Sequence, residues 1–291
     1  MTFAGAHTAL VTPFRDGQFD EPAFRRLIQH QIQGGISGIV PVGTTGESPT
    51  LDHKEHLKVI EIAVQASEKR SLVIAGTGSN STTEAVDLTV SAEKIGADAA
   101  LLVAPYYNKP SQEGLYQHFS AVAKAVKIPV VLYSIPGRCG IEIGIETVAR
   151  LARDYPNIMA IKEAGGSVER VNQLRGALPD TFEILSGDDS LTLPFMSVGA
   201  VGVVSVASNL IPAEVSMLVR HQAEGNSAAA LQIHRKYYPL FKDLFIEPNP
   251  VPVKFALARL GKTTAEVRLP LCEMSSTNAM RFGETLTAVG I

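Results

Sequence analysis

The sequence predicts an α/β fold, a (β/α)8 TIM barrel with a C-terminal helical extension. Three observations support it: eight short apolar runs recur up to Val206, segments with helical periodicity separate them, and no long break interrupts the alternation. An open, doubly wound sheet is the alternative, but eight regular repeats favour closure into a barrel. A barrel of about 250 residues is normally a single domain, which suits a chain of 291 residues.

The eight apolar runs are expected to form the strands of the barrel. Several are continuously apolar rather than alternating, which is typical of parallel strands buried on both faces. The runs are His7–Val11, Gly38–Val42, Leu72–Ala75, Ala99–Ala104, Pro129–Ile135, Ile158–Ile161, Glu183–Ser186 and Val201–Val206.

Segments with the spacing of amphipathic helices lie between these runs. Two of the segments begin with a capping box, in which a side chain and a glutamate three residues later satisfy free amides: Asp52 with Glu55, and Ser81 with Glu84. The residues that share one helix face are Phe24, Leu27, Ile28 and Ile32; Leu57, Ile60 and Val64; Ala85, Leu88, Ala92 and Ile95; Leu115, Phe119, Val122 and Val126; Val171, Leu174 and Leu178; and Val215, Leu218 and Val219.

The end of the chain contains no further strand. Three helical stretches fit there, Ser227–Leu244, Val251–Leu260 and Met274–Val289. We therefore expect residues 1–224 to form the catalytic barrel and residues 225–291 to form a helical extension packed on it.

Composition excludes several classes of protein. The net charge of -3, without a block of like charge, disfavours binding to nucleic acid or to an acidic membrane surface. No apolar run is long enough to span a bilayer. The segment Met1–Phe14 has no basic segment ahead of an apolar stretch, so we expect that it is not a signal peptide. Cys139 and Cys272 lie far apart and form no metal-ligand or redox pair, so we expect a reducing, cytoplasmic setting.

Polar residues follow the apolar runs at the point where each run ends. In such barrels the active site lies at the C-terminal ends of the strands, so these residues are expected to converge on one rim. They are Gly43–Glu47, Pro105–Asn108, Tyr133, Gly137–Arg138, Lys162–Glu163 and Gly187–Asp189.

Lys162 is the most informative of these residues. A lysine at the mouth of an apolar strand loses hydration, which lowers its pKa. The neutral amine can attack a keto acid, and the protonated imine then acts as an electron sink, so that a proton leaves the neighbouring carbon. The alternative is an ion pair with Glu163 or a lysine in solvent.

Other strand ends suit this chemistry. Tyr133 can move protons to and from the imine, although a core tyrosine is the alternative. Thr44 and Thr45, between glycines, offer amides and hydroxyls to a carboxylate, unless they are an ordinary polar turn. Arg138 has a planar fork that matches a second carboxylate, unless it is a surface arginine.

Three weaker signals point elsewhere. The glycine-rich segment Gly76–Ser81 follows a strand and opens a helix, but its third glycine is missing, which disfavours a dinucleotide site. His53 and His56 are spaced to share a metal ion, but no cysteine or HExxH arrangement supports one. Cys139 is either a reactive thiol or, as we favour, a small loop residue.

Six stretches of the chain together resemble the dihydrodipicolinate synthase family, in the class I aldolase group that includes N-acetylneuraminate lyase. The resemblance covers essentially the whole chain, and the Thr44-Thr45 pair and the Gly137-Arg138 step favour the synthase over the lyase. The stretches are Gly43–Ser48, Pro105–Pro110, Tyr133–Gly140, Ile161–Ala164, Leu185–Asp189 and Asn249–Lys254.

The resemblance implies a condensation of pyruvate with L-aspartate 4-semialdehyde in diaminopimelate and lysine biosynthesis. Lys162 would form the Schiff base, and Tyr133 would donate and accept protons. Thr44 and Tyr107 would complete the proton relay. No metal and no organic cofactor is expected, because the lysine imine supplies the electron sink.

Substrate contacts and assembly are implied in the same way. Pyruvate would contact Thr45, Gly187 and the main chain near Val204, and Arg138 would hold the semialdehyde carboxylate. In the family the tyrosine corresponding to Tyr107 crosses from a neighbouring subunit. A dimer would then be the minimal active unit, and a homotetramer built as a dimer of dimers is usual.

The resemblance also implies inhibition by lysine at a cleft of the dimer interface. Glu84 would pair with the ammonium group of lysine, with helix capping as its competing role. The residues that match the lysine-sensitive pattern are Ser48, His53, His56, Asn80, Glu84 and Tyr106.

Three positions depart from the family pattern. Ser134 stands where Asn is usual, and Cys139 and Gly165 stand where Thr is usual. They leave the imine chemistry intact, but they flank Tyr133, Arg138 and Lys162 and so bear on which aldehyde is used. A pyruvate-dependent aldolase or lyase for a sugar acid is therefore the alternative. A sugar aldehyde has no carboxylate for Arg138, which argues against it. A non-catalytic barrel that senses a keto acid or lysine would not need Lys162.

Overall fold

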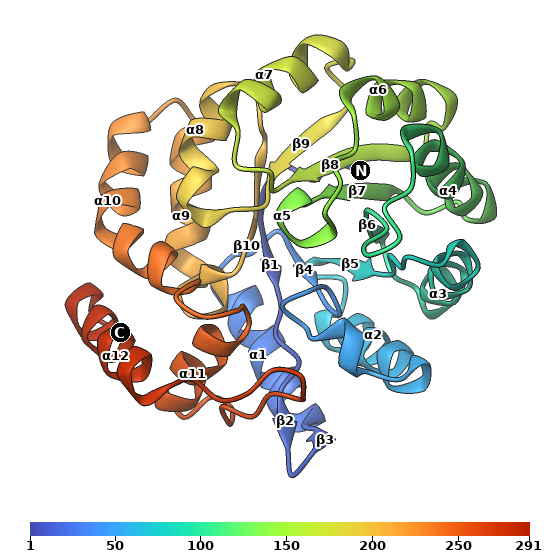
Figure 1. Ribbon diagram of the computed structural model, residues 1–291. Coiled ribbons are helices and arrows are strands. Elements are labelled where there is room, and N and C mark those ends of the chain that lie inside the picture. The colour runs from blue at the N-terminus through green and yellow to red at the C-terminus, as the bar shows by residue number, and fades with distance from the viewer.

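Eight parallel strands close into a barrel in the computed structural model, which describes residues 1–291 (Figure 1). Around the barrel the strands follow the order β1-β10-β9-β8-β7-β6-β5-β4. The (β/α)8 prediction is therefore confirmed, and the open sheet is excluded. The strands are β1 Gly5–Ala9, β4 Gly38–Val40, β5 Leu72–Gly76, β6 Ala99–Val103, β7 Val130–Ser134, β8 Ile158–Glu163, β9 Glu183–Ser186 and β10 Gly202–Ser205.

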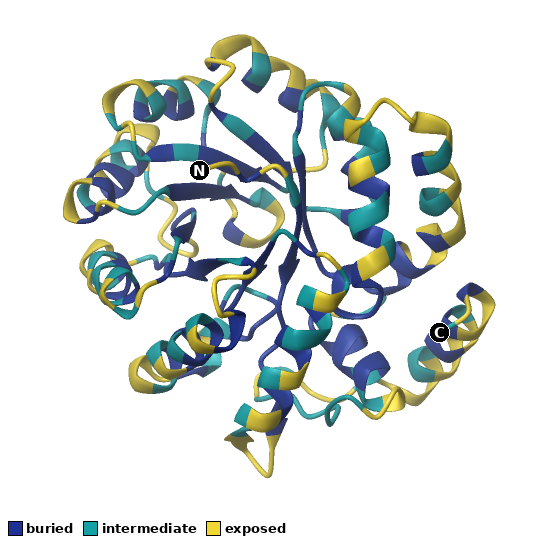
Figure 2. Cartoon of the chain, turned by 180° about the vertical axis from the view of Figure 1, so that it is seen from behind, coloured by how far each residue is buried: buried dark blue, intermediate teal, exposed yellow.

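Helices surround the barrel and turn their buried faces toward it, with exposed residues on the outer surface (Figure 2). Periodicity predicted six of the eight major helices, all but Ile145–Asp154 and Thr192–Ser197, and one such helix follows each strand of the barrel. None of them has both the length and the apolar character that crossing a bilayer requires. They are α1 Glu21–Gln33, α2 His53–Ser67, α3 Thr82–Ile95, α4 Gln112–Ala125, α6 Ile145–Asp154, α7 Val168–Ala177, α8 Thr192–Ser197 and α9 Pro212–Ala223.

The two predicted capping boxes form only in part. Asp52 Oδ1 accepts the amide of Glu55 at 2.8 Å, and Ser81 Oγ accepts the amide of Glu84 at 3.5 Å. Both glutamate carboxylates turn to other partners instead of closing the box. The Glu84 carboxylate therefore lies between His53 on the neighbouring helix α2 and Ser79, just before its own helix.

Glycine allows neighbouring strands and loops to approach closely at two points in the barrel. A Cβ at Gly202 would lie 1.9 Å from the carbonyl oxygen of Gly5 on the adjacent strand, and one at Gly76 would lie 2.5 Å from that of Val42. These contacts exclude any larger side chain. Gly76, part of the glycine-rich segment noted above, is thus required by packing.

The C-terminal extension consists of α10 Ser227–Asp243, α11 Val251–Arg259 and α12 Ser276–Val289. Helix α10 packs on α9, and α12 packs on α10 and α11 (Figure 1). Between α10 and α11 the chain returns to the barrel, where Phe245 and Asn249 line the cavity described below. The three helices are confirmed, while the division of the chain at residue 224 remains a prediction.

Two small elements were not predicted. Strands β2 Phe14–Arg15 and β3 Gln18–Phe19 form an antiparallel hairpin, and α5 Pro136–Cys139 is a single helical turn. Such elements are too short for periodicity to reveal. The Asp16-Gly17 pair, whose φ angles are 53° and 78°, is the turn signal that would have identified the hairpin.

Candidate active site

Residues at the predicted ends of β4, β7, β8 and β9 converge on an enclosed cavity of about 50 Å³ at the rim of the barrel, whereas Pro105–Asn108 after β6 do not line it. Several residues to which the sequence gave no role lie there as well, among them Val206, Phe245 and Asn249. The predicted residues that line the cavity are Thr44, Thr45, Tyr133, Arg138, Lys162 and Gly187.

Lys162 is placed on β8 beside Tyr133 on β7. The two residues are register partners in the parallel sheet, and Lys162 Nζ lies 4.1 Å from the centre of the tyrosine ring. Burial lowers the pKa of Lys162 to about 7, opposed by the nearby Asp189 and assisted by Arg138. A substantial fraction of this amine is therefore neutral near pH 7, as a nucleophile requires.

The alternative role of Lys162, an ion pair with Glu163, is excluded. Glu163 points to the other side of the sheet, where its carboxylate is fully buried and accepts Arg170 Nε at 2.9 Å. It also accepts the amide of Gly165 at 2.7 Å. Lys162 itself takes part in no ion pair and faces the cavity, so its amine is free to react.

Tyr133 is suited to keep its proton until the reaction needs it. The side chain is 5% exposed, and burial raises the pKa of its hydroxyl to about 12, which the neighbouring Thr44 side chain partly offsets. A protonated hydroxyl next to an amine can donate to a developing alkoxide and later recover the proton.

Asn249 links both predicted carboxylate-binding residues. Its side-chain Nδ2 donates to Thr45 Oγ1 at 2.9 Å, and its backbone carbonyl oxygen accepts a hydrogen bond from Arg138 Nη2 at 3.5 Å. Its own Oδ1 is buried without a partner. The sequence offered only one signal for this residue, its place at the start of the Asn249–Lys254 stretch.

Asp189 is the buried acid nearest to this chemistry. It accepts Ser205 Oγ at 2.5 Å and the amides of Val206 and Ala207 at 2.9 and 3.0 Å. Burial raises its pKa to about 6. The carboxylate thus fixes the turn after β10, where Val206 rather than the predicted Val204 lines the cavity.

The three departures from the family pattern lie outside the lining of this cavity, although Cys139 lines the larger cavity that adjoins it. Ser134 Oγ is buried and accepts the amide of Ile143 at 3.5 Å. A Cβ at Gly165 would lie 2.6 Å from Glu163 Oε1, so this glycine makes room for the buried carboxylate. Cys139 is 3% exposed and burial raises the pKa of its thiol to about 11, which favours the structural role predicted for it over a reactive thiol.

A second cavity of about 230 Å³ adjoins the first and shares Thr44, Tyr133 and Arg138 with it. Ser48 and Tyr106, both predicted lysine-binding residues, line its outer part. This arrangement brings the predicted lysine cleft next to the catalytic rim.

The predicted lysine-binding residues contact one another in pairs. His53 Nε2 lies 2.5 Å from Glu84 Oε1, His56 Nδ1 lies 3.4 Å from Ser48 Oγ, and Asn80 Nδ2 donates to the carbonyl of Tyr106 at 3.2 Å. The other ring nitrogen of His56 contacts the carbonyl of Gly76 at 2.9 Å. The two histidines therefore turn to different partners.

Tyr107 is the one predicted catalytic residue that does not reach the site of its own chain. It is 90% exposed, with a φ of 72°, and it lines neither cavity. A tyrosine held out on the surface in this way is positioned for contact with another molecule.

Comparisons with known proteins agree on one family. A model of the dihydrodipicolinate synthetase (DHDPS) family matches residues 2–289. A 4-hydroxy-tetrahydrodipicolinate synthase from Nitratidesulfovibrio vulgaris (strain DP4) is 50% identical and is matched over 100% of both chains. The synthase structure from Methylacidiphilum fumariolicum SolV is 57% identical, with a TM-score of 0.98 over 99% of this chain and 96% of that one. A DHDPS from Cyanidioschyzon merolae with lysine bound is 42% identical, with a TM-score of 0.96 over 99% and 98%.

Proposed function

The chain belongs to the dihydrodipicolinate synthetase family, and from this membership we propose that Lys162 forms the Schiff base through which it acts. Its function is that of a 4-hydroxy-tetrahydrodipicolinate synthase, a lyase of diaminopimelate and lysine biosynthesis. The substrates are pyruvate and L-aspartate 4-semialdehyde. The observation that carries the mechanism is the unpaired, buried amine of Lys162 in a cavity with Tyr133.

The reaction begins with attack of the neutral Lys162 amine on the keto carbon of pyruvate. Loss of water gives a protonated imine, which withdraws electrons from the methyl group, so that a proton leaves and an enamine forms. The enamine carbon then attacks the aldehyde, and the amino group of the semialdehyde displaces Lys162 from the regenerated imine, which closes the ring and frees the lysine. The lysine itself supplies the electron sink, and the mechanism uses no metal or organic cofactor.

Proton transfers are assigned to Tyr133 and Thr44. The Tyr133 hydroxyl donates to the oxygen that leaves as water and returns a proton to the aldehyde oxygen after attack. Thr44, next to it, passes these protons on. Tyr107 of a neighbouring subunit would complete the relay, because its own chain holds it in solvent.

The two carboxylates of the substrates are assigned to different groups. Thr45, held by Asn249, and the backbone near Gly187 suit the pyruvate carboxylate. Arg138 has the fork that a second carboxylate requires, and it lines the same cavity. This division favours the semialdehyde over a sugar aldehyde, which lacks a second carboxylate.

Trapping of the imine tests the mechanism. Pyruvate and borohydride should add one reduced pyruvate to Lys162, and Lys162→Ala should form no adduct. A matched lysine is Lys58, which is exposed on α2, and Lys58→Ala should form the adduct normally. An adduct on any lysine other than Lys162 would refute the assignment.

The aldehyde is tested separately by product formation with L-aspartate 4-semialdehyde beside N-acetylmannosamine and other sugar aldehydes. Turnover of the semialdehyde alone is expected. Turnover of a sugar aldehyde instead would retain the Schiff base and change the substrate. A trapped imine without any turnover would indicate a keto-acid sensor.

Lysine is proposed as the inhibitor of the chain. The cleft between α2 and α3 contains an acid, Glu84, for the ammonium group of lysine. Of its two histidines, His53 contacts Glu84 and His56 contacts Ser48. Of the predicted lysine-binding residues, Ser48 and Tyr106 line the cavity that also contains Thr44 and Tyr133, so a ligand bound in the cleft would lie next to the proton relay. A homotetramer is proposed as the assembly, with Tyr107 exchanged between the subunits of each dimer.

A further inference from the structure

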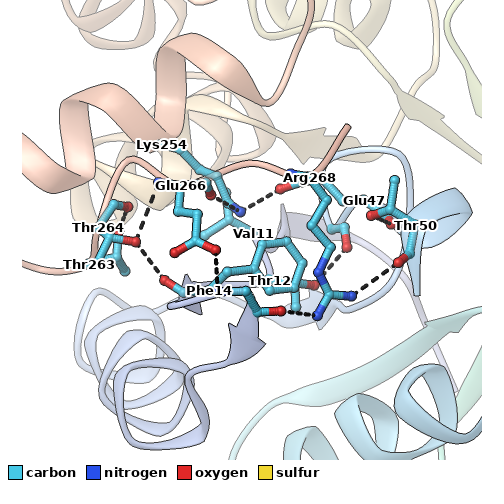
Figure 3. Close-up of polar contacts among 12 residues, drawn as sticks. Val11, Thr12, Phe14, Glu47, Thr50, Lys254, Thr263, Thr264, Glu266 and Arg268 are labelled. Atoms are coloured by element: carbon cyan, nitrogen blue, oxygen red, sulfur yellow. Dashed lines mark hydrogen bonds and ion pairs between the residues drawn. The ribbon is translucent and has the colours of Figure 1, made fainter. Parts of the chain in front are cut away.

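A second buried lysine lies outside the catalytic cavity, and the reaction as described does not use it. Lys254 on α11 and Glu47 after β4 form an ion pair in which both side chains are fully buried. The pair joins the C-terminal extension to the loop that follows Thr44 and Thr45 (Figure 3). Its position suggests a role in the geometry of that loop.

The Lys254 amine contacts a carboxylate, a backbone carbonyl and an aromatic ring. Nζ contacts Glu47 Oε1, donates to the carbonyl of Glu266 at 2.8 Å and lies 4.1 Å from the centre of the Phe14 ring (Figure 3). Lys162, in contrast, is unpaired and lines a cavity. Lys254 is therefore neither a nucleophile nor a base, and its role must come from what it holds.

Glu47 transmits this contact to the substrate-binding loop. It adopts a left-handed backbone with a φ of 55°, and its amide donates to the carbonyl of Thr44 at 3.1 Å. Its second carboxylate oxygen accepts the amide of Arg268 at 3.0 Å. The side chain of Glu47 is thus held from two directions, which fixes the backbone three residues after Thr44.

The same loop is held at two further points. Thr12, after β1, donates to the carbonyl of Gly46 at 2.7 Å, and Asn249, just before α11, donates to Thr45 at 2.9 Å. Thr45, which binds pyruvate in the proposed mechanism, therefore sits on a loop that one segment of the extension holds at two points. Asn249 lies two residues before the first residue of α11, and Lys254 lies one turn into the helix.

Stability alone does not account for a buried ion pair. Removing an ammonium and a carboxylate from water costs several kcal/mol for each ion, and replacing such a pair with apolar residues is often neutral or stabilising. An ion pair with additional hydrogen bonds is directional, however, whereas an apolar contact is not. The pair is better explained by the orientation that it imposes.

We propose that Lys254 is a positioning residue, which holds Glu47 and thereby places Thr44 and Thr45 for pyruvate. The inference deepens the proposed function, since it concerns the same site and rests on the Lys162 imine. The guanidinium of Arg268 also lies 4.1 Å from the centre of the Phe14 ring, so the same aromatic ring contacts both cations around Glu47.

The test compares Lys254→Met, the double variant Glu47→Gln with Lys254→Met, and Arg281→Met. The double variant leaves no buried charge unpaired. Arg281 pairs with Asp243 at 3.1 Å within the extension, far along the chain from the loop, and controls for general loosening of these helices. Thermal midpoint, kcat and the KM of each substrate are measured for all variants.

Both Lys254 variants should raise the KM for pyruvate about tenfold, because a misplaced loop binds its carboxylate less well. The KM for the semialdehyde should change less than about twofold, and Arg281→Met should match the unaltered protein. A double variant with normal stability and a normal KM for pyruvate would overturn the proposal. So would failure of both Lys254 variants to fold, which would make the pair a requirement of stability. Failure of the Schiff-base mechanism is distinguished by the absence of a trapped imine in the unaltered protein.

Discussion

At Lys162 the chemistry depends on the loss of a proton that a solvated lysine keeps. With a pKa of about 7, the amine is mostly protonated at pH 6 and mostly neutral at pH 8. Imine formation at low pyruvate, followed by trapping with cyanoborohydride, should therefore be about tenfold slower at pH 6 than at pH 8. The measurement is the initial trapping rate across this range.

Asp189 provides the control for that profile. Its negative charge raises the pKa of Lys162, so Asp189→Asn should move the midpoint of the profile to lower pH. A trapping rate that does not change between pH 6 and 8 would show that the neutral amine is not limiting.

The same pKa implies a cost in stability. Between pH 7 and the ordinary lysine pKa, the folded chain binds fewer protons than the unfolded chain, so the free energy of unfolding rises with pH in this window. Below pH 7 the buried amine is protonated in the folded chain as well, and the full destabilisation applies. Lys162→Met removes the amine and should stabilise the fold by about 2–5 kcal/mol at pH 6. The free energy of unfolding in urea measures this, and a destabilised variant at pH 6 would contradict it.

Single residues differ in how well the sequence identifies them. Lys162 and Tyr133 are predictable because each ends an apolar strand, and strand ends share one rim. Asn249 is not, because its contacts with Thr45 and Arg138 join segments more than 100 residues apart. Neither spacing nor periodicity carries information about a contact of that kind.

At the scale of elements, helices α2 and α3 form the proposed lysine cleft. Glu84→Ala removes the carboxylate that faces α2, so the lysine concentration for half inhibition should rise about tenfold. Activity without lysine should stay unchanged, because Glu84 lines neither cavity. Inhibition curves for the variant and the unaltered chain give the shift.

Glu61→Ala is the matched control for this prediction. Glu61 is an exposed acid on α2 that pairs only at the surface with Lys58 and Gln65. Its removal should leave the inhibition curve in place. A chain that does not respond to millimolar lysine would end the proposal of inhibition altogether.

Element type was predictable and element ends were not. The first apolar run predicted His7–Val11, but β1 covers Gly5–Ala9, because strand pairing with β10 begins at Gly5. Hydropathy cannot locate this boundary, since the residues just beyond the strand, Leu10 and Val11, are also buried.

At the scale of the whole molecule, the exposed Tyr107 makes a prediction about subunits. Tyr107→Phe and Lys162→Ala chains should each be nearly inactive alone. Mixed in equal amounts and allowed to exchange, they should recover about a quarter of normal activity, because half of the dimers are mixed and each has one complete site. Turnover before and after exchange is the measurement.

Subunit exchange must be shown independently, for example by mass spectrometry of mixed isotopes. No recovery after proven exchange would confine the relay to one chain.

The barrel itself was predictable from eight regular repeats. The contribution of the extension to the site was not, because helical periodicity shows that a helix packs but not against what.

The place of Asn249 and Lys254 near the end of the chain also orders events during synthesis. When the ribosome has synthesised all eight barrel strands, the nascent chain already contains Lys162, Tyr133 and Arg138. The loop with Thr44 and Thr45 still lacks its contacts with Asn249 and Lys254, which are synthesised later. A nascent chain therefore contains every reacting group well before it contains a finished site. Premature termination before Asn249 would release a barrel that holds its nucleophile but binds its substrate poorly.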